Sequence, residues 1–435
     1  MNSDSHLVRT VPGFISLLFL LLLTGCGEER QRSVLDFDSR NPAVSGSRFP
    51  MLYTEDGETL HMSWLSSIDE GLYTLQYASR DLFVNWADFP SIVTCNQEPV
   101  ALHWLRSIEG GGPHAYDIQI AFREENTNRW TSITPHRDGT ASEHGFVSMT
   151  PLDADRVLAI WLDGRETVGA HSDPQQSGAD GNTGSGPQGS AIEAETPSTG
   201  QVTAGAMTLR SAVVHRDGTL SQEQVIDSTV CDCCQTDMVA VEGGAVAVYR
   251  DRTADEVRDI SLVRYDSETG RWSEPVTVHD DGWQIEGCPV NGPRVASSEG
   301  DRLAVTWYTE ADGERRVLAA ISDDGGATFS EPVRLDSGAA IGRVDVVAVP
   351  DGGFYASWME QERGFASVYL RRFDREGLQS EPVRVGRTDA DRNSGFPRLA
   401  AMSDAVMAAW TQTEPLMRIR TVRLHYHLDT QEMVD

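Results

Sequence analysis

Short apolar stretches alternate with polar turns along most of the chain after residue 40. The turns are rich in Asp-Gly, Asn and Pro, and almost no segment has apolar residues at the spacing of an amphipathic helix. This pattern is typical of many short antiparallel strands. The chain is therefore predicted to be all-β.

One strand recurs along the chain, a short apolar stretch that ends in Trp or Tyr. Its copies are residues 60–64, 100–104, 157–161, 245–249, 303–307, 354–358 and 406–410. Most copies are about 40–60 residues apart, which is the spacing of four-stranded propeller blades. A row of independent sandwiches would not need the same motif in every unit. We predict a single β-propeller over residues 45–430, with seven blades favoured over six.

The first residues resemble an export signal. Arg9 precedes an apolar run over residues 11–24 that is too short for a comfortable membrane span. The run ends in Leu23-Thr24-Gly25-Cys26, which resembles the lipobox of bacterial lipoproteins. Residues 1–25 are therefore predicted to be a signal peptide, and Cys26 to carry a lipid that anchors the chain in the cell envelope, with the outer membrane favoured. An ordinary secretory signal is the alternative.

Two further segments depart from the blade pattern. Residues 26–44 are expected to form a tether, and a strand around residues 33–37 would complete the last blade, which lacks a clear fourth strand. Residues 167–204 contain mainly Gly, Ser, Asp, Gln and Pro. This composition predicts a disordered loop inserted within the third blade.

The charge balance limits the partners. The net charge is −30, and all 36 basic residues are arginine. Such an acidic surface repels nucleic acid and anionic lipid. Contact with the membrane is therefore expected only through the acyl anchor. We expect a monomer that takes no cofactor.

The segment Ser322-Asp323-Asp324-Gly325-Gly326-Ala327-Thr328-Phe329 matches the Asp-box of sialidase-type propellers, Ser-x-Asp-x-Gly-x-Thr-aromatic. Residues 79–86 are a weaker copy without the glycine. By these motifs the chain resembles the sialidase superfamily over roughly residues 45–430. The resemblance implies a sialidase-like β-propeller. It indicates the activity less well, because the box is a structural hairpin.

Sialidases bind the substrate carboxylate with three arginines, since a guanidinium fork fits a carboxylate in two places. Here Ser47-Arg48-Phe49-Pro50 keeps the Arg and Pro of the first arginine motif, and Arg294 and Arg398 each follow a proline at the start of a blade. These three arginines are candidates for substrate binding. Alternatively, they pair with acidic residues of adjacent blades.

The resemblance also implies a Tyr nucleophile, a Glu that activates it and an Asp acid/base. Tyr308 with Glu310 is the best local pair, and Asp163, just past an inner strand, is the candidate acid. A polar stretch near Glu143 and His144, together with Arg165, adds candidates for substrate binding. Salt bridging within a loop is the alternative for these residues.

Five cysteines remain besides Cys26, an odd number for an oxidising compartment. Aligning two blades brings Cys288 next to the trio Cys231, Cys233 and Cys234. A disulfide between Cys233 and Cys288 is favoured, worth about 2–4 kcal/mol. A soft-metal site formed by the four thiols is the alternative.

Together these features predict an envelope-anchored, sialidase-like propeller that binds anionic glycans and hydrolyses them as an exo-glycosidase. Two alternatives stay open: a glycan-binding or scaffold propeller without catalysis, and a periplasmic protein that handles thiols or metal through its cysteine cluster.

Overall fold

The structure is a computed structural model that describes residues 35–36, 43, 46–54, 60–69, 72–75, 78–82, 87–96, 98–112, 114–124, 130–167, 205–373 and 379–426. The described residues form 29 strands and three short 3₁₀ helices, η1 (Arg165–Thr167), η2 (Ala311–Gly313) and η3 (Arg392–Ser394). Within them, no helix has the length and apolar character needed to cross a bilayer. The predicted signal peptide, Cys26 and residues 168–204 lie outside the described residues.

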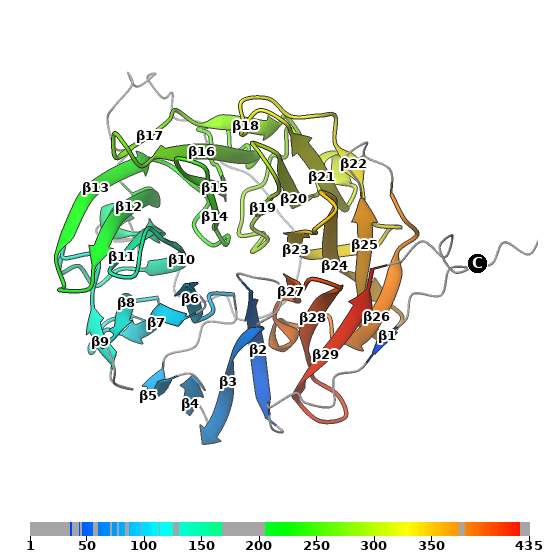
Figure 1. Cartoon of the computed structure of the whole chain (residues 1–435), viewed down its shortest axis with the longest axis horizontal. Helices are drawn as coiled ribbons and strands as arrows, with labels where there is room; N and C mark the ends of the chain where they lie inside the picture. Colours follow the sequence, from blue (N-terminus) through cyan, green and yellow to red (C-terminus); the bar gives the residue numbers. More distant parts are fainter. Residues whose placement is uncertain are drawn as a thin grey trace, which may run out of the picture.

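The strands form seven antiparallel sheets arranged around a central axis (Figure 1), so the chain is an all-β propeller with the favoured blade number. The first three blades are β2 (Ser47–Tyr53), β3 (His61–Asp69), β4 (Leu72–Leu75) and β5 (Ala78–Leu82); β6 (Ser91–Cys95), β7 (Glu98–Ser107), β8 (Tyr116–Arg123) and β9 (Trp130–Ile133); and β10 (His144–Pro151), β11 (Arg156–Asp163), β12 (Thr208–His215) and β13 (Leu220–Asp227).

The fourth and fifth blades are β14 (Asp237–Val241), β15 (Gly244–Arg250), β16 (Ile260–Asp266) and β17 (Arg271–Trp272), with β18 (Val276–His279) also paired to β16; and β19 (Arg294–Ser297), β20 (Leu303–Thr309), β21 (Arg316–Ser322) and β22 (Val333–Arg334). The sixth is β23 (Ala340–Ala348), β24 (Phe354–Glu362), β25 (Phe365–Phe373) and β26 (Val383–Thr388). The seventh is β27 (Arg398–Ala401), β28 (Ala405–Gln412), β29 (Arg418–His425) and β1 (Leu35–Asp36).

The seventh blade closes the ring with strands from both ends of the described chain. β1 pairs antiparallel with β29, with Leu35 opposite Leu424 and Asp36 opposite Arg423. β1 comes from the segment that the sequence assigns to a closing strand. Closure of this kind leaves no open end between the first and last blades.

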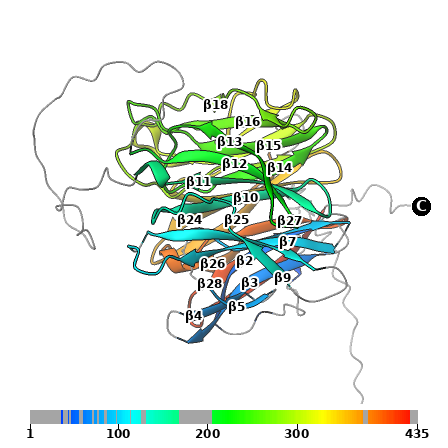
Figure 2. The ribbon, with the colours of Figure 1, turned by 90° about the vertical axis from the view of Figure 1, so that its left-hand side faces the viewer.

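The aromatic-ended strands are the second strand of each blade, namely β3, β7, β11, β15, β20, β24 and β28. Their aromatic rings pack between sheets; Trp307 and Trp358, for example, are almost fully buried. Burial of a large apolar side chain contributes roughly 2–3 kcal/mol. The innermost strands are the first of each blade, and side views show neighbouring blades packed against one another (Figure 2).

Polar side chains link neighbouring inner strands. Asp237 Oδ2 accepts the backbone N–H of Val295 at 2.9 Å, and Asp345 Oδ2 accepts that of Leu399 at 2.8 Å. These bonds satisfy backbone groups that have no partner strand across the axis. They also fix which inner-strand side chains face the axis.

One end of the propeller gathers two sets of loops. Because neighbouring strands are antiparallel, the loop that leads into an inner strand lies at the same end of the blade as the loop between its second and third strands. We call this end the entrance face. It holds residues 228–236, 280–293 and 310–315.

Candidate functional site

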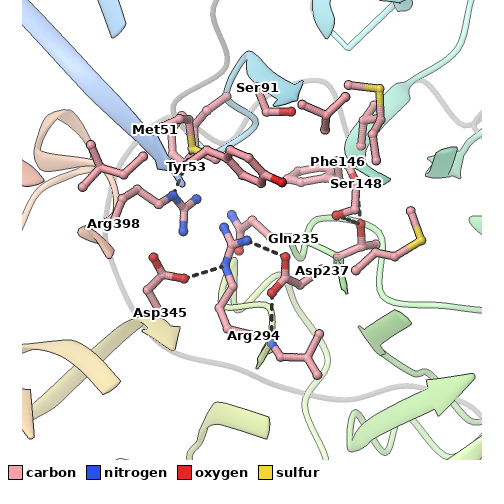
Figure 3. Close-up of a pocket in the computed structure, with 18 of the residues that line it drawn as sticks. Met51, Tyr53, Ser91, Phe146, Ser148, Gln235, Asp237, Arg294, Asp345 and Arg398 are labelled. Atoms are coloured by element: carbon pink, nitrogen blue, oxygen red, sulfur yellow. Dashed lines mark hydrogen bonds and ion pairs between the residues drawn. The ribbon is translucent and has the colours of Figure 1, made fainter. Parts of the chain in front are cut away.

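The inner strands surround a central cavity of about 240 Å³ (Figure 3). Every blade contributes at least one side chain to its lining. In blade order, these include Met51, Ser91, Ser148, Asp237, Arg294, Asp345 and Arg398.

The charged side chains of the cavity alternate in sign over four successive blades. Arg294 Nη1 lies 2.9 Å from Asp237 Oδ1, and Arg294 Nε lies 3.8 Å from Asp345 Oδ1. Arg398 donates through Nε to the sulfur of Met51 at 3.1 Å. Among the described residues, its Nη1 is buried and has no hydrogen-bond partner. Two of the three predicted arginines, Arg294 and Arg398, thus line the same cavity. Arg294 pairs with acidic residues of the adjacent blades, which is the alternative that the sequence left open.

Burial dominates the electrostatics of the cavity. Burial, followed by the neighbouring Arg294 charge, lowers the pKa of Arg398 to about 9, against the opposing effect of Asp345 and Asp237. Burial also raises the pKa of Asp345, although both arginines oppose this. An extra negative charge would therefore be stabilised beside Arg398.

Three aromatic rings pack near the end of the cavity that faces the entrance loops. Phe49, Phe89 and Phe396 each precede a lining residue by two positions and are buried. The ring centroids of Phe49 and Phe89 are 5.1 Å apart, and those of Phe89 and Phe396 are 5.4 Å apart. The Arg398 guanidinium lies over Phe89 at 5.5 Å. These rings therefore pack beside Arg398, and Gln235 of an entrance loop lines the same cavity.

The third predicted arginine lies elsewhere. Arg48 is not among the residues that line the cavity, and its guanidinium lies over the Phe49 ring at 5.1 Å from the centroid. The three predicted arginines therefore do not converge. Arg48 precedes Met51 by three residues, across a β-bulge that shifts the register of β2.

Asp163 ends the second strand of its blade rather than following an innermost one. Its Oδ2 accepts the indole N–H of Trp161 at 2.8 Å, and both oxygens accept bonds from Arg165. Burial opposes ionisation, but the Arg165 hydrogen bonds hold the pKa of Asp163 below its ordinary value. An ionised carboxylate held in this way does not supply a proton.

The residues around His144 form a buried polar cluster, in which the ring nitrogens of His144 have no hydrogen-bond partner among the described residues. The rings of His136 and His144 stack with centroids 3.7 Å apart, and His144 Nε2 lies 3.2 Å from Asp138 Oδ2. Two groups here could hold a metal: Asp117 with His136 and His144, and Asp138 with His144 and Asp163. Arg165 already brings a cation to the second group, 3.2 Å from Asp138 Oδ2. This favours the loop salt bridge over a binding role.

Tyr308 and Glu310 are close to each other but are not among the residues that line the cavity. Tyr308 Oη donates to Glu310 Oε2 at 3.3 Å, and the Tyr308 ring packs edge-on against Trp283. Burial, followed by the Glu310 charge, raises the pKa of Tyr308. Neither residue lines the cavity that contains the arginines.

The structure adds a second Tyr–Glu pair that the sequence did not indicate. Tyr116 Oη donates to Glu143 Oε1, and the two residues are 27 positions apart. Burial raises the pKa of Glu143 to about 7, helped by the charges of Asp88 and Asp232 and opposed by the Tyr116 hydrogen bond. Only the packing of the second blade against the third brings this pair together.

Sequence reasoning also missed Asp237 and Asp345. Both occupy the position in their inner strands that Arg294 and Arg398 occupy in theirs. The alternation of acidic and basic residues at this position could have revealed them. To see it, the sequences of the blades must be aligned residue by residue, and the β-bulges of β2 and β23 obscure that alignment.

The described cysteines are all free thiols in this structure. The Sγ atoms of Cys231 and Cys234 are 3.2 Å apart, and Cys288 hydrogen-bonds with Cys233. The Cys233–Cys288 disulfide therefore stays a prediction. The residues that it would join are neighbours.

Comparison with known proteins finds similar solved structures but no family. No protein-family model matches the sequence, and no curated protein matches it. Among solved structures, a protein of unknown function from Dyadobacter fermentans is similar, with 11% identity, a TM-score of 0.48 and coverage of 79% of this chain and 97% of that one.

Two sialidases are also similar. Trypanosoma rangeli sialidase has 12% identity and a TM-score of 0.42, with 90% of this chain and 59% of that chain covered. The NanB sialidase of Streptococcus pneumoniae has 11% identity and a TM-score of 0.36, with 90% and 70% covered. The chain spans only 59% of the length of the trypanosomal sialidase. At such values the likeness carries no argument about activity. The class of protein is a seven-bladed β-propeller.

Proposed function

We propose that the central cavity binds a small acidic ligand, specifically the carboxylate-bearing sugar of a glycan, without hydrolysing it. The observation that carries this proposal is the unpartnered Nη1 of buried Arg398 beside Arg294. A buried polar atom without a partner is rare in a folded protein and indicates a missing ligand or water. A guanidinium fork is suited to a carboxylate.

The size and polarity of the cavity support a sugar. With a volume of about 240 Å³, the cavity is of a size for one sugar unit rather than an oligosaccharide. Ser91, Gln235 and the Tyr53 side chain also line it. Hydroxyl and amide groups bind sugar hydroxyls, and an aromatic ring offers an apolar face.

The positions of the candidate catalytic residues argue against hydrolysis. Asp163, Tyr308 and Glu310 do not line the cavity. A general acid must reach the atom that it protonates within about 3 Å. We therefore propose a binding protein and not a glycosidase.

Two features support the wider setting. In the Ser322–Phe329 hairpin, Asp324 Oδ1 accepts the N–H of Thr328 at 2.9 Å, and Ser322 Oγ accepts that of Gly326 at 2.8 Å. These contacts support membership of the sialidase superfamily through an Asp-box. The lipobox-like end of the apolar run supports export and a lipid anchor on Cys26 at the outer membrane.

Calorimetry with N-acetylneuraminate, glucuronate and their methyl esters tests the proposal. The acids should bind, and the esters should bind at least about tenfold more weakly, because a charge-assisted hydrogen bond contributes about 1.5–3 kcal/mol. Arg398→Lys retains the positive charge but loses the fork, so it should weaken acid binding by about tenfold or more. Incubation with a fluorogenic sialoside should release no product.

Arg48→Lys is the matched control, because Arg48 lies outside the cavity lining. It should bind the acids as the wild type does. Equal binding of acid and ester would contradict the proposal, and so would equal losses in the Arg48 and Arg398 variants. Release of sugar would show that hydrolysis takes place after all.

A further inference from the structure

Four cysteines from two loops meet on the entrance face. Cys231, Cys233 and Cys234 lie in the loop before β14, and Cys288 lies in the loop before β19. The Sγ atoms of the first three all lie within 4.8 Å of one another, and Cys288 hydrogen-bonds with Cys233. We infer that these four thiols form a binding site for a soft metal ion, Cu(I) or Zn(II).

The spacing of the sulfur atoms suits a shared ion. A disulfide requires two sulfurs at about 2.05 Å, whereas Cys231 Sγ and Cys234 Sγ are 3.2 Å apart. Four sulfurs in a tetrahedron, each about 2.3 Å from a zinc ion, lie about 3.8 Å from one another. Among Cys231, Cys233 and Cys234, the Sγ separations are no more than 4.8 Å, and that between Cys231 and Cys234 is 3.2 Å, so they are compatible with that value. Cys288 would supply the fourth sulfur from its position beside Cys233.

Burial shields the site from water, and its sulfur donors determine which ions it binds. Cys231 and Cys234 are 1% and 2% exposed, so an ion held there is shielded from water on that side, and Cys288 offers the exposed edge through which it enters. The donors of the cluster are all sulfur. Thiolates favour Cu(I) and Zn(II) over Mg²⁺ and Ca²⁺, which prefer oxygen.

The surrounding charges fit a metal thiolate. Four thiolates around a divalent ion carry a net charge of −2, and around a monovalent ion −3. Arg258 is buried, and its Nη1 lies 3.2 Å from Cys231 Sγ. Arg250 is also buried and acts electrostatically on Cys231 and Cys234. Two buried guanidinium groups oppose this charge, as outer-shell groups do in metal sites, and Arg258 also pairs with Glu256 at 2.6 Å.

The site is independent of the proposed sugar cavity. None of the four cysteines lines that cavity. Loss of sugar binding would leave the metal site intact, and the reverse also holds.

Metal uptake by the full chain tests the inference. The protein is purified anaerobically, reduced, freed of reductant and titrated separately with Zn(II) and Cu(I) against a chromogenic chelator for each ion. Native mass spectrometry then counts bound ions. We expect one ion per chain. Cys231→Ser and Cys234→Ser should lower the affinity by more than the ~10–100-fold typical of outer-shell changes.

Cys95→Ser is the matched control. Cys95 ends β6 and lies outside the cluster, so this variant should bind metal as the wild type does. If a cluster variant fails to fold, the rate of alkylation of exposed Cys288 in the wild type serves instead, and bound metal should slow it at least tenfold. No uptake, an unchanged alkylation rate, or a disulfide among the four cysteines in the anaerobic protein would overturn the inference.

Discussion

At the scale of single residues, Glu143 is a carboxyl group of the entrance face with a raised pKa. Burial raises its pKa to about 7, and the nearby charges of Asp88 and Asp232 add to the effect. Tyr116 donates a hydrogen bond to it. Near neutral pH, therefore, Glu143 exchanges its proton while the ordinary glutamates of the surface are already ionised.

This environment predicts a pH-dependent stability. Between pH 5 and 8 the folded state holds the Glu143 proton after the unfolded state has released it, so the free energy of unfolding falls as the pH rises. Glu143→Gln removes the titration but keeps an oxygen to accept from Tyr116. Relative to the wild type, this variant should gain roughly 2–3 kcal/mol on going from pH 5 to pH 8, at about 1.4 kcal/mol per tenfold change in proton affinity.

Urea denaturation of both proteins at the two pH values measures the difference. Glu331→Gln replaces an exposed glutamate and should leave the pH dependence unchanged. A Glu143→Gln variant that tracks the wild type at both pH values would mean that Glu143 is ionised throughout.

Residue type alone misleads about Asp163. Trp161 donates its indole N–H to Asp163 at 2.8 Å, and Trp358 donates to Glu360 at the same distance in another blade. In both blades the acid follows the tryptophan by two residues and anchors its ring. A sequence shows an acid after an aromatic strand, which an active site would also show. The hydrogen bonds that satisfy it become visible only in three dimensions.

At the scale of elements, the contacts between inner strands decide the geometry of the axis. Gln235 Oε1 accepts the N–H of Gly292 at 2.9 Å, and its Nε2 donates to the carbonyl of Ala87 at 2.9 Å. The Gln235 side chain, in the loop before the fourth blade, thus links the loops that lead into the second and fifth blades. The backbones of Gln235 and Gly292 approach so closely that only glycine fits.

Gly292→Ala should therefore destabilise the protein strongly. A Cβ at this position would lie 1.9 Å from the carbonyl oxygen of Gln235, and backbone cannot move aside as a flexible side chain can. We expect a loss of about 3 kcal/mol in the free energy of unfolding, measured by urea denaturation.

Gly287→Ala is the control from the same loop. Its Cβ would meet nothing closer than 3.9 Å, so the change should stay within about 0.5 kcal/mol. Similar losses in the two variants would mean that any side chain in this loop has the same effect. The close approach of Gln235 to Gly292 would then not be the cause.

Elements were easier to predict from the sequence than the site. The aromatic-ended strands recur because each ring packs between sheets, and this local requirement is visible in every copy. Blade closure is less visible, because β1 and β29 pair across almost the whole chain. The site depends on bulges in the inner strands. The shift between Arg48 and Met51 is one of these, and it places Met51 and not Arg48 at the cavity.

At the scale of the whole molecule, charge is the dominant feature. The chain has a net charge of −30, and its 66 acidic residues face only 36 basic ones. Many arginines form surface ion pairs such as Arg302 with Asp323, and exposed pairs of this kind contribute little. The acidic residues exceed the basic ones by 30, so compaction brings like charges together.

Salt should therefore stabilise the protein. At neutral pH the melting temperature should rise by several degrees between about 10 mM and 1 M NaCl, as the Debye length falls from about 30 Å to about 3 Å and self-repulsion is screened. The same titration at pH 4 is the control, because protonation of the carboxylates removes most of the repulsion and should shrink the rise. If stability came mainly from surface ion pairs, salt would instead lower the melting temperature at neutral pH. Differential scanning calorimetry at both pH values measures the melting temperature and shows whether self-repulsion or surface ion pairing dominates.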